Sequence, residues 1–159
     1  MTGLLKNFFD HTAYIYHRPS FFDKKALVVV STAGAGQNKV AKYIDETLRH
    51  WGFNKNYKIA IAFGAREHPE TKEIDKIDKT SQKFRTDLES KKLHGPKFID
   101  LIFYNAWRAM TQVDEPNPTD KEYWENTDLV NHEFAPIVKL NIIQKMCGKL
   151  FFFIFNRMF

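Results

Sequence analysis

The stretch KKALVVVSTAGAGQNKVAKYIDETLRHWG, from Lys24 to Gly52, carries the clearest secondary-structure pattern in this sequence. Ala26 to Val30 is an unbroken apolar run with three consecutive valines, which is typical of a β-strand buried on both faces. From Asn38 onward apolar residues recur at helical spacing, and Gly52 ends the predicted helix. A loop of small residues joins the two elements. The stretch therefore predicts a strand–loop–helix unit of an open α/β sheet.

The loop in this unit is the candidate ligand site. Ligands of open α/β sheets bind at the carboxyl ends of the strands, where such loops lie. Small side chains let the backbone approach a ligand closely, and the free N–H groups at a helix N-terminus favour an anionic or electron-rich partner. The candidate cofactor-binding residues are Ser31, Thr32, Ala33, Gly34, Ala35, Gly36 and Gln37.

Two common phosphate-binding fingerprints fit this loop poorly. Lys39 stands where the dinucleotide-binding pattern needs its third glycine, and Gln37 follows Gly36 where a P-loop needs lysine. A Rossmann-type NADP domain stays open as an interpretation, because Arg66 follows the second predicted strand and could bind a 2′-phosphate. A tight turn without any ligand also stays open, since glycines alone are a weak signal.

The rest of the chain predicts one more strand and several helices. Lys58 to Phe63 is a second apolar run, and the single helix before it predicts parallel pairing of the two strands. Helices are predicted after Thr2, over Glu70 to Lys92 and over Phe98 to Val113. The buried stripe of the long middle helix is predicted to consist of Ile74, Ile77, Phe84 and Leu88.

Composition limits the function classes. The 159 residues, 43% of them hydrophobic, are enough for the core of one domain. The net charge is +5, but acidic and basic residues alternate over Glu70 to Lys92, which predicts a solvated helix face and argues against nucleic-acid binding. The histidines show no metal-ligand spacing, so no metal site is predicted. One cysteine, Cys147, excludes an intrachain disulfide, and no signal peptide opens the sequence, so we expect a cytoplasmic protein.

The number of predicted strands is too small for a parallel sheet. Such sheets need cover on both faces and usually hold about 4–6 strands, whereas this sequence offers two clear candidates. We therefore expect either that another chain completes the sheet or that strands belonging before Met1 are absent. The abrupt helical start favours the second explanation.

Three segments resemble the C-terminal half of the flavodoxin-like NAD(P)H-dependent oxidoreductases, the family that includes FMN reductases and iron–sulfur flavoproteins. TGLLKNFFDHTAYIYHRPSFFDKK is similar to the helix and loop after the family's third strand, with His11 where arginine is usual. ALVVVSTAGAG resembles the fourth strand and its flavin-side loop. The segment from DLIFYNAWRAM through DKEYWENTDLVNHEF to the final lysine- and phenylalanine-rich residues resembles a C-terminal extension found in one branch.

The resemblance implies a three-layer fold with a parallel sheet, an FMN cofactor, NAD(P)H as electron donor and a small-molecule electron acceptor. It places Ser31 to Gly36 along the flavin ring, with Gln37 close by. Nothing here corresponds to the family's N-terminal strands or to the phosphate loop after its first strand, so we expect weak or no FMN binding by this chain alone. A non-catalytic remnant or interaction module that binds no cofactor is the alternative. His17-Arg18-Pro19 is open to two interpretations, a border of the flavin or nucleotide site and an ordinary loop.

The last part of the chain has a different character. Residues 1–113 are predicted to belong to the flavodoxin-like part, and residues 114–159 to an extension with an apolar tail. The tail contains Phe151-Phe152-Phe153-Ile154-Phe155 with lysine and arginine on both sides. We expect it to dock on the protein. Peripheral contact with a membrane surface and packing across a homo-oligomer stay open.

Overall fold

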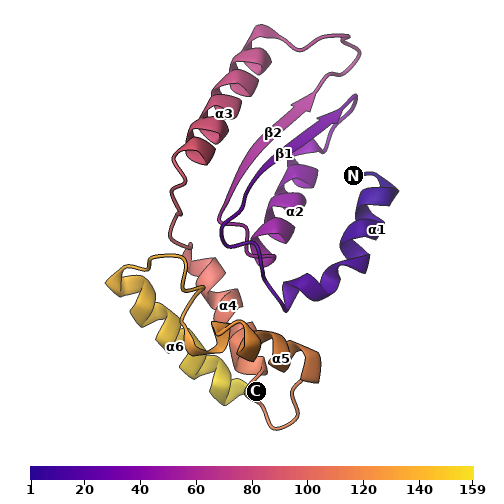
Figure 1. Cartoon of the computed structure of the whole chain (residues 1–159). Coiled ribbons are helices and arrows are strands. Elements are labelled where there is room, and N and C mark those ends of the chain that lie inside the picture. The colour runs from indigo at the N-terminus through magenta and orange to yellow at the C-terminus, as the bar shows by residue number, and fades with distance from the viewer.

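The computed structural model describes residues 1–159 as a mixed α/β chain with six α-helices and a two-stranded parallel sheet (Figure 1). The α/β class is therefore confirmed. The elements are α1 (Gly3–His11), the 3₁₀ helix η1 (Ala13–Tyr16), β1 (Lys25–Thr32), α2 (Gln37–His50), β2 (Lys55–Ala62), α3 (Thr71–Glu89), α4 (Phe98–Met110), α5 (Pro118–Asn126), the 3₁₀ helix η2 (Leu129–Asn131) and α6 (Ile142–Met158).

The two strands pair in parallel, as predicted. Their register runs from Lys25 opposite Lys55 to Thr32 opposite Ala62, and α2 connects them. Each strand has one partner only, so both outer edges of the sheet are unpaired within the chain. The sheet is therefore narrower than the parallel sheets of stable domains.

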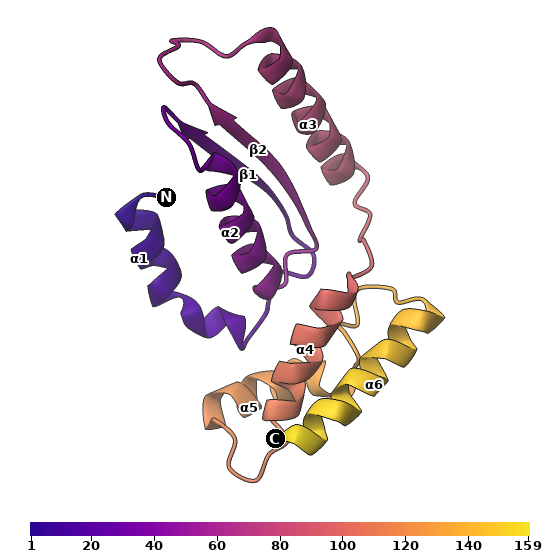
Figure 2. The same ribbon diagram turned by 180° about the vertical axis from the view of Figure 1, so that it is seen from behind.

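The helices α2 and α3 lie on opposite faces of the strand pair (Figures 1 and 2). Side chains of a strand alternate between its two faces. In β2, Asn56 and Lys58 donate hydrogen bonds to Asp45 of α2, whereas the hydroxyl of Tyr57 donates one to Asp87 of α3. α1 lies on the α2 side, where the ring of Phe9 packs against those of Tyr43 and Trp51.

β1 is not buried on both faces, and this part of the prediction is wrong. Val28, which faces α2, is 5% exposed, but Val29 on the opposite face is 64% exposed. α3 packs over β2 and leaves this face of β1 open. For the same reason two members of the predicted buried stripe of α3 are exposed, Ile74 and Leu88. A sheet of two strands is too narrow to bury all the apolar residues along one face of α3.

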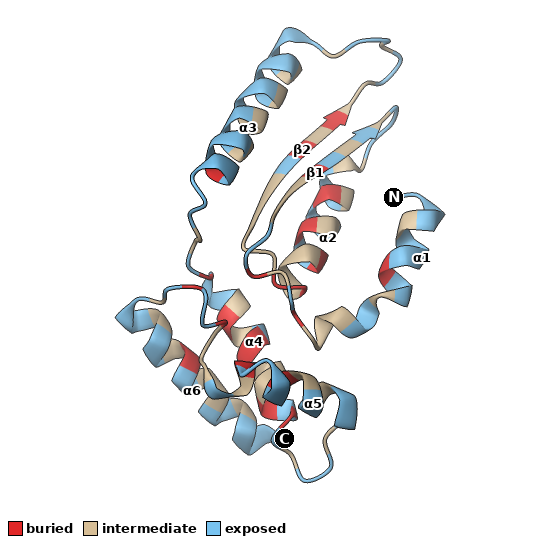
Figure 3. Ribbon diagram, viewed as in Figure 1, coloured by how far each residue is buried: buried red, intermediate tan, exposed pale blue.

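The C-terminal helices form a second cluster at the amino ends of the strands (Figure 1). α6 packs along α4, and α5 and η2 close the other side. Figure 3 shows buried positions gathered on the inner side of α4. The core of this cluster consists of Phe22, Tyr104, Trp124, Leu129, Ala135 and Val138. α4 itself belongs to this cluster, and the boundary between residues 113 and 114 stays a prediction.

No helix in the structure combines the length and the apolar composition that crossing a lipid bilayer requires.

Candidate functional site

The seven predicted binding residues come together at the carboxyl end of β1. Ser31 and Thr32 end the strand, Ala33 to Gly36 form the loop, and Gln37 begins α2. None of the seven is buried (Figure 3). The bend therefore keeps an open face, as a ligand-binding loop must.

The backbone of this loop presents free hydrogen-bond donors. Gly36 precedes α2 with a φ of 93°, a left-handed conformation that glycine adopts without strain, and no side chain caps the helix. The N–H groups of the first turn of α2 therefore have no partner in the helix. The N–H of Gly34 is different, because it donates to Oγ1 of Thr32 at 3.2 Å. The arrangement can hold an electron-rich or anionic group at the positive end of α2.

Arg66 lies after the neighbouring strand but is already paired with carboxylates. Its Nη1 lies 2.8 Å from Glu70 Oε1 and 3.1 Å from Glu73 Oε2, and its Nη2 donates to the carbonyl of Ala62 at 2.7 Å. The hydrogen bond to Glu73 raises the pKa of Arg66. Arg66 therefore links the start of α3 to the end of β2. Because its guanidinium is already bound to two carboxylates, there is little support for a 2′-phosphate site at Arg66.

His17 and Arg18 lie at the opposite end of β1 and contact α5. Nδ1 of His17 lies 3.0 Å from Asp120 Oδ2, and Nε of Arg18 donates to Asp120 Oδ1. The ring of His17 also stacks on Trp107 at 4.0 Å. Of the two interpretations, the structure supports the ordinary loop, because these side chains join the N-terminal segment to the C-terminal cluster.

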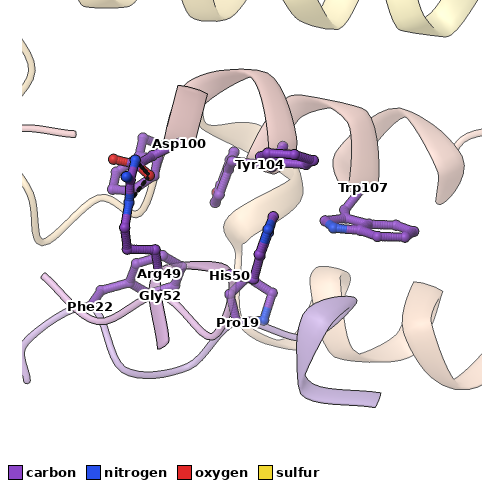
Figure 4. A pocket seen from close by; sticks show the side chains of 10 residues that line it. Pro19, Phe22, Arg49, His50, Gly52, Asp100, Tyr104 and Trp107 are labelled. Carbon is purple, nitrogen blue, oxygen red and sulfur yellow. Dashed lines mark hydrogen bonds and ion pairs between the residues drawn. The ribbon is translucent and has the colours of Figure 1, made fainter. Parts of the chain in front are cut away.

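A small cavity lies between α2 and α4 (Figure 4). Arg49 and Asp100 are at one end, where Nε of Arg49 donates to Oδ1 of Asp100 at 3.0 Å, and His50 points toward α4. Burial, and then the charge of Arg49, lower the pKa of His50. The volume is about 20 Å³, which is room for one water molecule and not for a flavin or nicotinamide. The cavity is therefore a packing gap at the junction.

A larger polar groove of about 450 Å³ lies at the amino ends of the strands. Its lining includes Asn54, Lys55, Lys58, His94 and Lys97. Its size would suit a small ligand. However, ligands of open α/β sheets bind at the carboxyl ends, which are at the other side of the molecule.

Asp87 anchors α3 to the sheet, although no motif in the sequence singled it out. The side chain is 9% exposed, and its Oδ1 lies 3.0 Å from Lys25 Nζ and 2.8 Å from His94 Nε2. Oδ2 accepts a hydrogen bond from Tyr57 at 2.9 Å. Burial alone would raise the pKa of Asp87, but the hydrogen bonds from His94, Lys25 and Tyr57 outweigh it and lower the pKa to about 2. The available signal was the spacing from Phe84, which puts Asp87 on the inner side of α3.

Comparisons of the chain with models of protein families, with curated proteins and with solved structures give no match. No group of three or more histidine, cysteine, aspartate or glutamate side chains is placed to hold a metal ion. The functional interpretation therefore depends on the residues and on the geometry of the loop.

Proposed function

We propose that this chain forms the ring side of the cofactor site in a flavodoxin-like, FMN-dependent NAD(P)H oxidoreductase of the flavin or quinone reductase type. When bound, FMN supplies the chemistry, by passing electrons from NAD(P)H to a small-molecule acceptor. The observation that carries the proposal is the open loop Ser31–Gln37, with uncapped N–H groups, at the carboxyl end of a parallel strand.

The fit between this loop and a flat ring follows from its side chains and its backbone. A Cβ added to Gly34 or Gly36 meets no heavy atom within 4 Å, so nothing fills the space beside either residue. The side chains of Ala33 and Ala35 are methyl groups, and Gly34 and Gly36 have only hydrogen, so a planar ring can approach the backbone of the loop. The free N–H groups of the first turn of α2 can donate to ring carbonyl oxygens and stabilise negative charge on them.

The arrangement of the helices supports the flavodoxin-like part of the proposal. α1 and α2 lie on one side of the two strands and α3 lies on the other, which is compatible with a three-layer arrangement. The exposed side chain of Val29 and the unpaired outer edge of β1 are suited to further parallel strands. We propose that FMN binds firmly only when such strands extend the sheet from β1 and supply the anchor for its phosphate.

The alternative is an interaction module that keeps this architecture but binds no cofactor. One observation favours it: neither of the two cavities described above includes a residue of the Ser31–Gln37 loop. The two proposals differ in whether the chain alters the reactivity of a flavin.

Anaerobic reduction of excess FMN by NADPH or NADH, followed by bleaching of the visible flavin band, tests the proposal. We expect the chain to accelerate bleaching over buffer, and Gly34→Leu to abolish the acceleration, because the new side chain occupies the open face of the loop. Gly3→Leu is the matched control, since it adds the same side chain to open space on α1.

Thermal unfolding should show that both variants fold, because neither leucine meets a heavy atom within 4 Å of its Cβ. Bleaching at the buffer rate with either nicotinamide would reject the oxidoreductase and leave the interaction module.

A further inference from the structure

Helix α6 has two apolar sides, and only one of them is covered. The inner side packs on α4, as expected for a docked tail: Gly148 is buried against Glu133, and the guanidinium of Arg108 lies 4.0 Å from the centre of the Phe152 ring. A Cβ on Gly148 would come within 2.6 Å of Glu133 Cβ, so α6 sits very close to its neighbours here. This side fixes the helix in one orientation.

The outer side of α6 carries a continuous stripe of large apolar residues. Ile142 is 78% exposed, and Leu150 and Phe153 are each 54% exposed. Their spacing places them on one face of the helix. The full stripe is Ile142, Ile143, Met146, Leu150, Phe153 and Ile154. At its start Ile143 shares a groove with the exposed Phe98 of α4, so the patch extends over both helices. Apolar patches of this kind mark interaction surfaces.

Every charged side chain in the last segment of the chain is basic. From Lys139 to the end of the chain there are four basic residues, Lys139, Lys145, Lys149 and Arg157, and no acidic residue. Lys145 and Lys149 are exposed along one border of the stripe, and Arg157 lies near its far end with its guanidinium 4.5 Å from the Phe153 ring centre. An apolar stripe bordered by lysines is typical of helices that lie in the interface of an anionic membrane.

We propose that the outer face of α6 binds an anionic lipid surface, with the stripe in the acyl boundary and Lys145 and Lys149 at the headgroups. The charge pattern decides between this surface and a second copy of the chain. Two α6 helices packed through their stripes would bring lysines together without any carboxylate of α6 to pair with them. An anionic lipid surface supplies the missing negative charge, worth roughly a fivefold gain in binding for each lysine near the surface.

Co-sedimentation of the full chain with vesicles tests this proposal. We expect the chain to sediment with vesicles that contain phosphatidylserine and to stay in solution with pure phosphatidylcholine vesicles. Leu150→Glu combined with Phe153→Glu should reduce binding by about tenfold or more for each residue, because each loses apolar burial in the lipid. Lys145→Gln combined with Lys149→Gln should reduce binding by roughly thirtyfold and weaken its dependence on salt.

Matched controls lie on α3, which carries exposed residues of the same kinds. Lys79→Gln combined with Lys83→Gln removes the same number of positive charges from α3. Ile74→Glu replaces an exposed apolar side chain of α3 with a carboxylate. Neither change should affect sedimentation. Thermal unfolding should show that every variant folds. A wild-type chain that stays in solution with phosphatidylserine vesicles overturns the proposal. If that chain is also a dimer that Leu150→Glu and Phe153→Glu dissociate, the stripe belongs to a second copy.

Discussion

Asp87→Ala is expected to lower the free energy of unfolding by about 3–5 kcal/mol, because removal of one member of a buried ion pair leaves the other charge without a partner. The charge left behind is that of Lys25, whose side chain is 4% exposed. Tyr57 and His94 lose their hydrogen-bond acceptor in the same change. Chemical denaturation near neutral pH measures the loss. Asp78→Ala, on the exposed side of α3, is the matched control and should change stability by less than about 0.5 kcal/mol.

The lowered pKa of Asp87 also predicts how the free energy of unfolding decreases at acid pH. Asp87 has a pKa of about 2 in the folded chain against 3.8 for an ordinary aspartate. As the pH falls, the unfolded chain therefore takes up this proton first. The part of the free energy of unfolding that depends on the ionisation of Asp87 is about 2 kcal/mol. It is complete above the ordinary carboxyl range and is lost as the pH falls toward about 2. Stability that falls equally in the wild type and Asp87→Ala over this range would contradict the assignment.

Trp124→Ala is expected to cost about 3–5 kcal/mol, because it empties the centre of the C-terminal cluster. Trp124 is fully buried, packs edge-on against Tyr104 at 4.9 Å and donates its Nε1 hydrogen to the carbonyl of His17 at 2.8 Å. The change therefore removes core volume and one link to the N-terminal segment together. Urea unfolding followed by circular dichroism measures the loss.

Trp124→Phe separates these two contributions. It keeps a ring in the core and removes the hydrogen bond, so we expect a smaller loss than with alanine. Phe98→Ala is the control for an aromatic residue that is 55% exposed, and it should cost less than about 0.5 kcal/mol. A loss at Trp124 no larger than the loss at Phe98 would show that α5 is not part of the folded core.

The sequence was sufficient for the parallel unit because local patterns determine it. The valine run, the small loop and the helical spacing before Gly52 each depend on neighbouring residues, and β1 and α2 form within two residues of the predicted bounds. β2 begins at Lys55, three residues before the predicted start at Lys58. The exposure of Val29 could not be predicted in this way, since it depends on how many strands α3 has to cover. α4 also ends at Met110 rather than at Val113.

In the candidate site, too, features set by neighbouring residues were predictable and features set by distant contacts were not. The placement of the Ser31–Gln37 loop at a strand end followed from the order of the elements, and its open face agrees with the structure. Asp87 pairs with Lys25 and Asp120 pairs with Arg18, and both contacts join elements far apart in the sequence, so no local pattern contained them. The burial of Asp87 was not predicted, because the alternating charges of α3 are typical of a helix face exposed to solvent.

The proposed function requires that the open loop after β1 receives a flavin ring. Amide NMR spectra recorded while FMN, and separately riboflavin, is added to the chain test it most directly. We expect shifts confined to the backbone amides of residues 31–38, with similar affinity for both flavins, because the phosphate has no anchor here. Unchanged amides in this loop would rule out the proposed flavin contact, as would shifts with FMN alone in the polar groove around Lys55, Lys58 and Lys97.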